Sequence, residues 1–218
     1  MKPYYQDESV TIYHGDCRDI LPEIELCDFA WTDPPYNVGK NYGIWDDSLS
    51  NEAYLLFCKE WIEELKRLSQ GMAIYLPTKY ALSYWQLLGQ GFHQIILPWT
   101  PEGAIRSGFI NQFASLLTNA KPKQRTKDVW YGVQMRGMGY FFKEYSYGHP
   151  GYTSEDVTSR VITAFTLHGQ VILDPFLGSG TTAYCAKKLN RKSIGIEIEE
   201  EYCEIAATRC SQMVMDLT

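Results

Sequence analysis

Hydrophobic positions along the chain follow two periodicities. Short apolar runs predict strands at 10–14, 28–32, 72–76, 94–99, 128–133, 171–174 and 193–197. Between them, apolar residues spaced three and four apart predict helices at 52–69, 79–89, 154–167, 181–189 and 199–213. Strands that alternate with helices predict an α/β fold, with a doubly wound, mostly parallel seven-stranded sheet and helices on both faces.

Two segments, 100–127 and 134–152, interrupt this alternation. Both are rich in glycine, proline, aromatic and basic residues, which favours loops or a small insertion over a second domain. A chain of 218 residues also suits a single core. We therefore expect one domain over residues 1–218, with an insertion at about 100–152.

Composition excludes several classes of protein. Apolar residues make up 45% of the chain and charged residues 21%, and no apolar run is long enough to span a membrane. The six cysteines are scattered, with no spacing typical of metal ligands. We expect a cytoplasmic protein with reduced thiols, no membrane contact and no metal, because the N-terminus also lacks an export signal.

Charge is distributed unevenly. The net charge is −6, yet residues 104–147 hold seven basic residues against two acidic ones, which gives +5 there and −11 elsewhere. Local charge decides where a phosphate backbone can lie, so this segment is a candidate nucleic-acid surface. A solvated loop at 121–127 would produce the same pattern.

A glycine loop follows the strand at 171–174. That strand ends at Asp174, Gly178 and Gly180 form the loop, a helix starts at Thr181, and the next strand ends at Glu197. Glycines permit close approach of a ligand, and an acidic residue at the end of the following strand is placed to bind ribose hydroxyls. Neither GxGxxG nor a Walker motif is present, and an ordinary glycine turn remains an alternative.

The stretch TDPPY leaves the strand at 28–32 through two prolines. Prolines fix φ and restrict the preceding residue, so Asp33 and Tyr36 are held with little motion. A solvated turn needs no such rigidity, which makes this pair a candidate for a functional site. The alternative is a turn that ends the strand with Tyr36 in the core.

These motifs together resemble those of a known family. DPFLGSGTT followed by IGIE resembles the S-adenosylmethionine-binding motifs of amino-group DNA methyltransferases, and DPPY ahead of them resembles the circularly permuted β class. The similarity covers most of the chain and is weakest at 100–152. It implies a Rossmann-like methyltransferase fold, S-adenosyl-L-methionine as cofactor, DNA with a flipped base as substrate, and 100–152 as target-recognition region.

The resemblance also implies roles for individual residues. The catalytic residues would be Asp33, Pro34, Pro35 and Tyr36, with Asp33 accepting hydrogen bonds from an exocyclic amino group and Tyr36 stacking on the base. The cofactor would be bound by Asp16, Cys17, Asp33, Asp174, Phe176, Gly178, Ser179, Gly180, Thr181, Thr182 and Glu197. Contacts with DNA are expected from Asn37, Lys40, Arg106, Lys121, Lys123, Arg125, Lys127, Arg136 and Lys143.

The target atom follows from the first residue of the motif. In this family Asp is usual for N6-adenine enzymes and Ser is common for N4-cytosine enzymes, so Asp33 favours adenine, with cytosine N4 as the alternative. C5 methylation requires a thiol nucleophile, usually in Pro-Cys, and the chain has none. The loop NVGKNYGIWDD is expected to be mobile and to close over the base.

One segment departs from the family pattern. Relatives carry His-Pro followed by Lys-Pro; here His149 and Pro150 match, but Glu155 and Asp156 stand near the Lys-Pro position. A helix starting at Thr153 or Ser154 can still form. The short recognition region suggests a brief target, a homodimer or a partner subunit, so a weakly active partner subunit is a second hypothesis. The chain has no room for a restriction nuclease, and an orphan or phage-type enzyme is expected.

Overall fold

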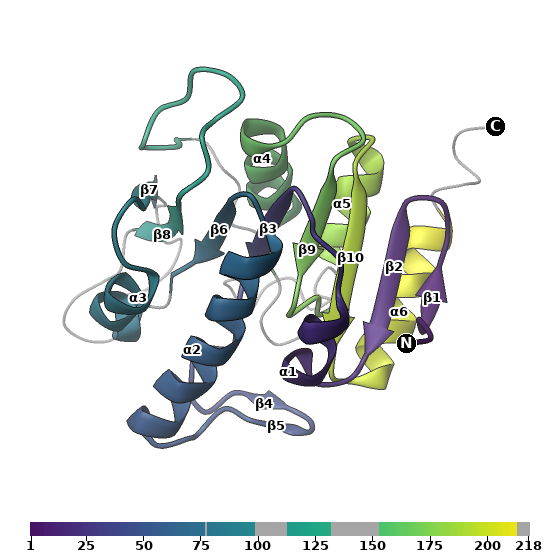
Figure 1. Cartoon of the computed structure of the whole chain (residues 1–218), viewed down its shortest axis with the longest axis horizontal. Helices are drawn as coiled ribbons and strands as arrows, with labels where there is room; N and C mark the ends of the chain where they lie inside the picture. The colour runs from purple at the N-terminus through teal and green to yellow at the C-terminus, as the bar shows by residue number, and fades with distance from the viewer. Residues whose placement is uncertain (77, 99–112, 132–152, 213–218) are drawn as a thin grey trace, which may run out of the picture.

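The computed structural model describes residues 1–76, 78–98, 113–131 and 153–212 (Figure 1). Within them lies one eight-stranded sheet with the order β1-β2-β10-β9-β3-β6-β8-β7. Its strands are β1 (Tyr5–Gln6), β2 (Val10–His14), β3 (Phe29–Thr32), β6 (Met72–Tyr75), β7 (His93–Pro98), β8 (Phe113–Thr118), β9 (Val171–Asp174) and β10 (Lys192–Glu197). The five central strands β2, β10, β9, β3 and β6 are parallel, which confirms the predicted fold class.

Helices cover both faces of the sheet (Figure 1). They are α1 (Cys17–Ile20), α2 (Asn51–Leu68), α3 (Ala81–Leu88), α4 (Glu155–Phe165), α5 (Thr181–Lys188) and α6 (Glu200–Gln212), with 3-10 turns η1 (Leu21–Glu23) and η2 (Thr78–Tyr80). Helices α1, α2 and α3 share one buried cluster, whereas α4 and α5 share another on the opposite face and α6 packs beside α5. The five helices predicted from periodicity are confirmed to within two residues at each described end.

Side chains on β3 show why the central strands are apolar throughout. Ala30 faces the cluster under α2, while Phe29 and Trp31 face the cluster under α4, and all three are buried. A strand covered on both faces has no polar side, as is usual in parallel sheets. The sheet therefore holds its carboxyl edge rigidly between two packed layers.

The strand predicted at 128–133 is not found over its described residues, 128–131. There the chain makes only an isolated bridge between Val129 and Ile96. The apolar character there comes from Trp130, which packs against Phe165 of α4 with ring centroids 6.4 Å apart. The sheet instead uses β8, which lies in a segment predicted as loop and pairs antiparallel with both β6 and β7.

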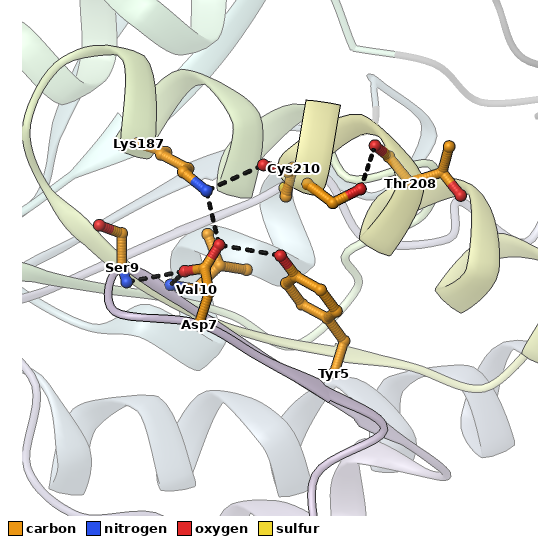
Figure 2. A network of polar contacts seen from close by, with 8 residues as sticks. Tyr5, Asp7, Ser9, Val10, Lys187, Thr208 and Cys210 are labelled. Carbon is orange, nitrogen blue, oxygen red and sulfur yellow. Dashed lines mark hydrogen bonds and ion pairs between the residues drawn. The ribbon is translucent and has the colours of Figure 1, made fainter. Parts of the chain in front are cut away.

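A polar cluster fixes the opposite, N-terminal edge of the sheet (Figure 2). Asp7 Oδ1 accepts hydrogen bonds from the backbone N–H groups of Ser9 and Val10, both at 2.8 Å. Asp7 Oδ2 accepts from the Tyr5 hydroxyl at 2.9 Å and from Lys187 Nζ at 2.5 Å. Lys187 also donates to a carbonyl in the last turn of α6. One carboxylate thus joins the β1–β2 turn to α5 and α6.

The six cysteines are free and buried. Burial raises the pKa of each thiol, to about 12 for Cys27 and about 11 for Cys58, which makes them poor nucleophiles at neutral pH. Across the described residues, no group of three or more His, Cys, Asp or Glu side chains is arranged to hold a metal ion. No helix in the same ranges is long and apolar enough to cross a bilayer.

Candidate active site

Four strands deliver polar residues to the same edge of the sheet. Asp33 follows β3, Asp174 ends β9, Glu197 ends β10 and Asp16 follows β2 by two residues. These strands are parallel neighbours, so their carboxyl ends lie side by side. Residues far apart in sequence therefore meet where ligands bind in doubly wound sheets.

Asp174 is the central anchor of this edge. Its Oδ1 accepts from Thr32 Oγ1 at 2.8 Å and from the Phe176 N–H at 3.1 Å, and its Oδ2 accepts from Thr182 Oγ1 at 2.5 Å. Burial raises the pKa of Asp174 to about 6 although these three donors oppose it. The side chain fixes the ends of β3 and β9 and the start of α5 relative to one another.

The glycine loop takes left-handed backbone conformations. Gly178 has φ 55° and Gly180 has φ 83°. A Cβ at Gly180 would lie 2.6 Å from the Cβ of Ala206, so glycine is also required for α6 to pack against the loop. Glu197 Oε2 accepts from the Gly178 N–H at 2.7 Å, and its Oε1 accepts from the Glu199 N–H at 2.9 Å. Burial raises the pKa of Glu197 to about 7.

One pocket unites the two motifs. Seven of the predicted site residues line it, together with Trp31, Thr153 and Leu177. These seven are Asp33, Asp174, Phe176, Gly178, Ser179, Thr181 and Thr182. The loop and the DPPY turn thus face a common space.

Asp16, Cys17, Gly180 and Glu197 are not part of that lining. Gly15 N–H donates to the Glu197 carbonyl at 2.9 Å, which places Asp16 next to the end of β10. Asp16 caps α1 and pairs with Arg18 at 2.6 Å; burial would raise its pKa, but Arg18 outweighs this and lowers it. The Cys17 side chain belongs to the buried core. Contacts between these four residues and a cofactor stay predictions.

Asp33 is partly buried, and both of its carboxylate oxygens are occupied. The Tyr36 hydroxyl donates to Oδ1, and the Thr153 hydroxyl donates to Oδ2. Burial raises the pKa of Asp33, while the two hydroxyls and the charge of Lys40 act against that rise. Sequence reasoning treated Thr153 only as a helix start, because a contact across 120 residues leaves no local signal.

The two prolines are held by α2. Pro34 is buried, and the Pro35 carbonyl accepts a 2.8 Å hydrogen bond from the Tyr54 hydroxyl. Tyr54 is completely buried and its hydroxyl lies 3.1 Å from that of Tyr84 on α3. The turn is therefore anchored to two helices as well as to β3.

Asn37 does not face outward as its predicted contact with DNA requires. Its side chain is 5% exposed, and Nδ2 donates to the Leu49 carbonyl at 3.0 Å and to the Tyr80 hydroxyl at 2.8 Å. Its φ of 53° is left-handed, a conformation that Asn tolerates better than most residues. The geometry supports a structural role in the loop after Tyr36.

The loop expected to be mobile has an internal scaffold. It contains the hairpin β4 (Asn41–Tyr42) and β5 (Trp45–Asp46), which Figure 1 shows below the sheet. Asp47 is 3% exposed and accepts from the N–H groups of Asn37 at 2.7 Å, Val38 at 3.0 Å and Lys40 at 3.0 Å. The hairpin turn also reaches the end of β10, where the Ile44 N–H donates to Glu199.

The basic residues predicted to contact DNA lie in separate parts of the structure. Lys40 is exposed in the loop beside Asp33. Lys121, Lys123, Arg125 and Lys127 are exposed too, but they follow β8, which runs opposite to β3. The Lys123 N–H donates to the carbonyl of Ala164 at the end of α4. Figure 1 accordingly shows this teal loop and the β4–β5 hairpin at opposite ends of the molecule.

Charge pattern alone could not reveal this separation, because the unpredicted strand β8 reverses the chain before the basic segment. From there the segment continues to β7, three strand positions and about 14 Å from β3. Contact between these four cations and DNA stays a prediction, and their placement separates them from Asp33. Arg106, Arg136 and Lys143 lie outside the described residues.

Comparison with known proteins defines the class of this site. Residues 27–90 and 106–208 match the N6/N4 DNA methylase family. The sequence is 33% identical to the Type II methyltransferase M.HpaI of Haemophilus parainfluenzae, over 84% of this chain and 67% of that one. It is 30% identical to M.ScaI of Streptomyces caespitosus, over 95% of this chain and 83% of the relative. The chain therefore belongs to the N6/N4 DNA methylase family.

Solved structures share its fold. The M1.HpyAVI–SAM complex matches with a TM-score of 0.67 at 23% identity, covering 92% of this chain and 98% of the other. The cytosine-N4-specific PvuII DNA methyltransferase matches with a TM-score of 0.73 at 14% identity, covering 99% and 93%. At these identities the likeness establishes the methyltransferase fold and leaves the target base open.

Proposed function

We propose that this member of the DNA methylase family transfers a methyl group from S-adenosyl-L-methionine to N6 of adenine, in a short target and with the base flipped out of the duplex. The observation that carries the proposal is the single pocket that Asp33 shares with the glycine loop. A carboxylate beside a cofactor loop is the arrangement that methylation of an amino group needs, because donor and acceptor must be held in contact.

The chemistry of the target explains the role of Asp33. An exocyclic amino nitrogen is a poor nucleophile because its lone pair is delocalised into the ring. A carboxylate oxygen and the carbonyl near Pro34 can accept hydrogen bonds from the two N–H groups of this amino group. These hydrogen bonds direct the nitrogen lone pair at the methyl group. Asp33 Oδ1 now accepts from Tyr36, so an incoming amino group takes the place of that hydroxyl. The displaced ring is then available to stack on the base.

The residues around the loop suit the cofactor. S-adenosyl-L-methionine supplies an electrophilic methyl group when bound, so no enzyme nucleophile is required. The N-terminus of α5, where Ser179 and Thr181 line the pocket, would favour the cofactor's carboxylate. Glu197 presents carboxylate oxygens at the end of β10, where ribose hydroxyls can donate to them.

The choice of adenine rests on Asp33 itself. This residue heads the motif in place of the serine common in the N4-cytosine enzymes. A carboxylate is a stronger hydrogen-bond acceptor than a hydroxyl, and it is held at a fixed angle by two donors. Lys40, exposed next to the site, is our candidate for a phosphate contact near the flipped base.

The proposal is tested by incubating the protein with genomic and plasmid DNA and methyl-labelled cofactor, followed by mass spectrometry of the nucleosides. We expect N6-methyladenine. N4-methylcytosine alone would retain the enzyme class and overturn the choice of base. No methylated DNA, under conditions where calorimetry shows cofactor binding, would instead support the partner-subunit hypothesis.

The structure bears on that second hypothesis. The departure at Glu155 motivated it, but Glu155 pairs with Arg209 at 3.2 Å and α4 forms beside the pocket. The sequence change is therefore compatible with a helix at this place beside the pocket, which supports activity over a subunit role. The relatives named above are Type II methyltransferases, and on this basis we propose a restriction–modification role over the orphan role. Light scattering would show whether the chain is a homodimer.

A further inference from the structure

The segment that departs from the family pattern contributes directly to the catalytic turn. Thr153 is the residue before the N-cap of α4, is partly buried and lines the pocket. Its hydroxyl donates to Asp33 Oδ2, while Tyr36 donates to Oδ1. One donor comes from the same turn as Asp33 and the other from an element 120 residues away.

The start of α4 is held in place from several sides. Ser154 Oγ accepts from the Val157 N–H at 3.2 Å and so caps the helix. Glu155 pairs with Arg209 at 3.2 Å, and the Glu155 carbonyl accepts from the Cys185 thiol at 3.8 Å. Because α5 and α6 both contribute, Thr153 has a fixed position relative to the sheet.

We infer that Thr153 is a positioning residue for methyl transfer: its hydroxyl holds Oδ2 of Asp33 so that Oδ1 is the atom presented to the amino group of the base. The inference rests on the proposed function of Asp33. In this role Thr153 acts through Asp33 and not directly on the methyl group or the amino nitrogen.

The two donors are not equivalent, and this asymmetry supports the inference. Tyr36 must give up Oδ1 when the base enters and its ring stacks, whereas Thr153 can keep Oδ2 throughout. The terminal torsion of an Asp side chain is soft and roughly two-fold. Without Thr153, the carboxylate would lose its only described hydrogen bond that survives base entry, and it would rotate.

Thr153 also favours the ionised carboxylate. Among the described residues, the titratable groups that interact electrostatically with Asp33 are Tyr36, Tyr42 from β4, Tyr75 from β6, Lys40, and Asp174 from β9. Burial raises the pKa of Asp33, and the Thr153 hydrogen bond is the largest influence against it. Removing that donor raises the pKa of Asp33 further. On acidification, an activity that requires the ionised form therefore begins to fall at a higher pH than in wild type.

The test compares Thr153→Val, which keeps shape and removes the donor, with Thr153→Ser, which keeps the donor. Thr163→Val, at an exposed position on the same helix, is the control. We expect kcat of Thr153→Val to fall about 10-fold or more at neutral pH, with KM for the cofactor within about twofold. The acid limb of its kcat profile should move upward in pH, and Thr153→Ser and Thr163→Val should resemble wild type.

A second readout does not depend on turnover. The carboxyl carbon of Asp33, assigned by its absence in Asp33→Asn, is titrated by NMR in protein carrying ¹³C-labelled aspartate. An upward shift in the titration of Thr153→Val supports the contact, and an unchanged titration overturns the inference. If wild type methylates no DNA, the proposed function fails while this titration still decides whether Thr153 controls Asp33.

Two activity results would also overturn the inference. One is a Thr153→Val enzyme with wild-type kcat and an unmoved acid limb. The other is a Thr153→Ser enzyme as impaired as Thr153→Val, which would assign the effect to the lost methyl group. Should Thr153→Val fold poorly, Thr153→Ala serves in its place, and its circular dichroism is checked first.

Discussion

Arg209 Nη1, on α6, donates a 2.6 Å hydrogen bond to the main-chain carbonyl of Ser179 in the glycine loop. The same guanidinium pairs with Glu155 on α4 and lies 5.1 Å from the ring centre of Tyr184 on α5. Its side chain is 5% exposed. A single buried cation therefore sets the loop against three helices.

Replacing Arg209 should loosen the cofactor loop. Arg209→Met leaves the Ser179 carbonyl and Glu155 without their partner, so we expect about 10-fold weaker cofactor binding and a lower unfolding temperature. Arg209→Lys should recover only part of this, because an ammonium lacks the planar fork. Calorimetry and thermal unfolding measure both effects, with the exposed Lys192→Met as control. Unchanged affinity in Arg209→Met would contradict the role given to this contact.

Asp33→Ala should separate binding from chemistry. We expect kcat to fall by about 100-fold or more, since the acceptor of the amino group is gone, with cofactor affinity retained. Stability should change little, because burial raises the pKa of Asp33 and its ionised form is not favourable to folding. Single-turnover methylation and calorimetry provide the measurements. Asp19→Ala on the exposed side of α1 controls for loss of charge, and full activity in Asp33→Ala would refute the mechanism.

Two substitutions of Tyr36 should separate the contribution of its ring from that of its hydroxyl. Tyr36→Phe removes the group that occupies Asp33 Oδ1 but keeps the stacking surface, so activity should stay within a few-fold of wild type. Tyr36→Ala should lower the affinity for a flipped base about 10- to 100-fold, the usual worth of one stacking contact. Fluorescence of 2-aminopurine at the target position reports flipping. Equal loss in both variants would show that the hydroxyl is required.

Asp47 should control the loop that follows the motif. Asp47→Asn places an amide N–H₂ where backbone N–H groups now donate, so at least one of the three hydrogen bonds is lost. We expect faster proteolysis within residues 37–49 and a lower kcat/KM for DNA, with cofactor binding less affected. Asp46→Asn, the exposed neighbour, is the matched control. If the two variants behave alike, the three backbone hydrogen bonds to Asp47 do not contribute to activity.

Asp7 should make stability dependent on pH at the N-terminal edge. Burial raises its pKa, but Lys187 and the other donors outweigh burial and lower it below 3.8. A lowered pKa in the folded state stabilises the fold above the unfolded pKa, and this contribution is lost as pH falls through the folded value. Asp7→Asn should cost about 1–3 kcal/mol at pH 7, and this cost should shrink as the pH falls below the ordinary range of an Asp carboxyl. Urea unfolding at pH 7 and at progressively lower pH, with Glu8→Gln as control, measures the difference.

Much of this site could be predicted from sequence. Both motifs directly follow apolar strands, so a parallel sheet was bound to bring Asp33 and the glycine loop to one edge. The glycines in the sequence predicted a tight loop, and Gly178 and Gly180 do have left-handed backbone conformations. Local patterns carry this information because strand ends and tight turns are local structures.

Contacts across the sheet could not be predicted in the same way. Thr153 reaches Asp33, and Arg209 reaches Ser179, only because helices far apart in sequence pack side by side. The error at residues 128–133 has a related cause: Trp130 is apolar because it packs on α4, and periodicity cannot separate that packing from a place in the sheet. Because β8 was not predicted, the edge of the sheet at which the basic segment lies was not predicted either.

The bonds of Asp174 have a consequence for how this protein fails. Its two oxygens hold Thr32, one residue before the catalytic turn, and Thr182, in the first turn of the helix behind the glycine loop. Displacement of Asp174 would remove a partner from both segments at once, so the two halves of the site depend on one residue. Under heat or denaturant, cofactor binding and the order of the catalytic turn should therefore be lost in one step. No state that binds the cofactor but has an unfolded catalytic turn should accumulate.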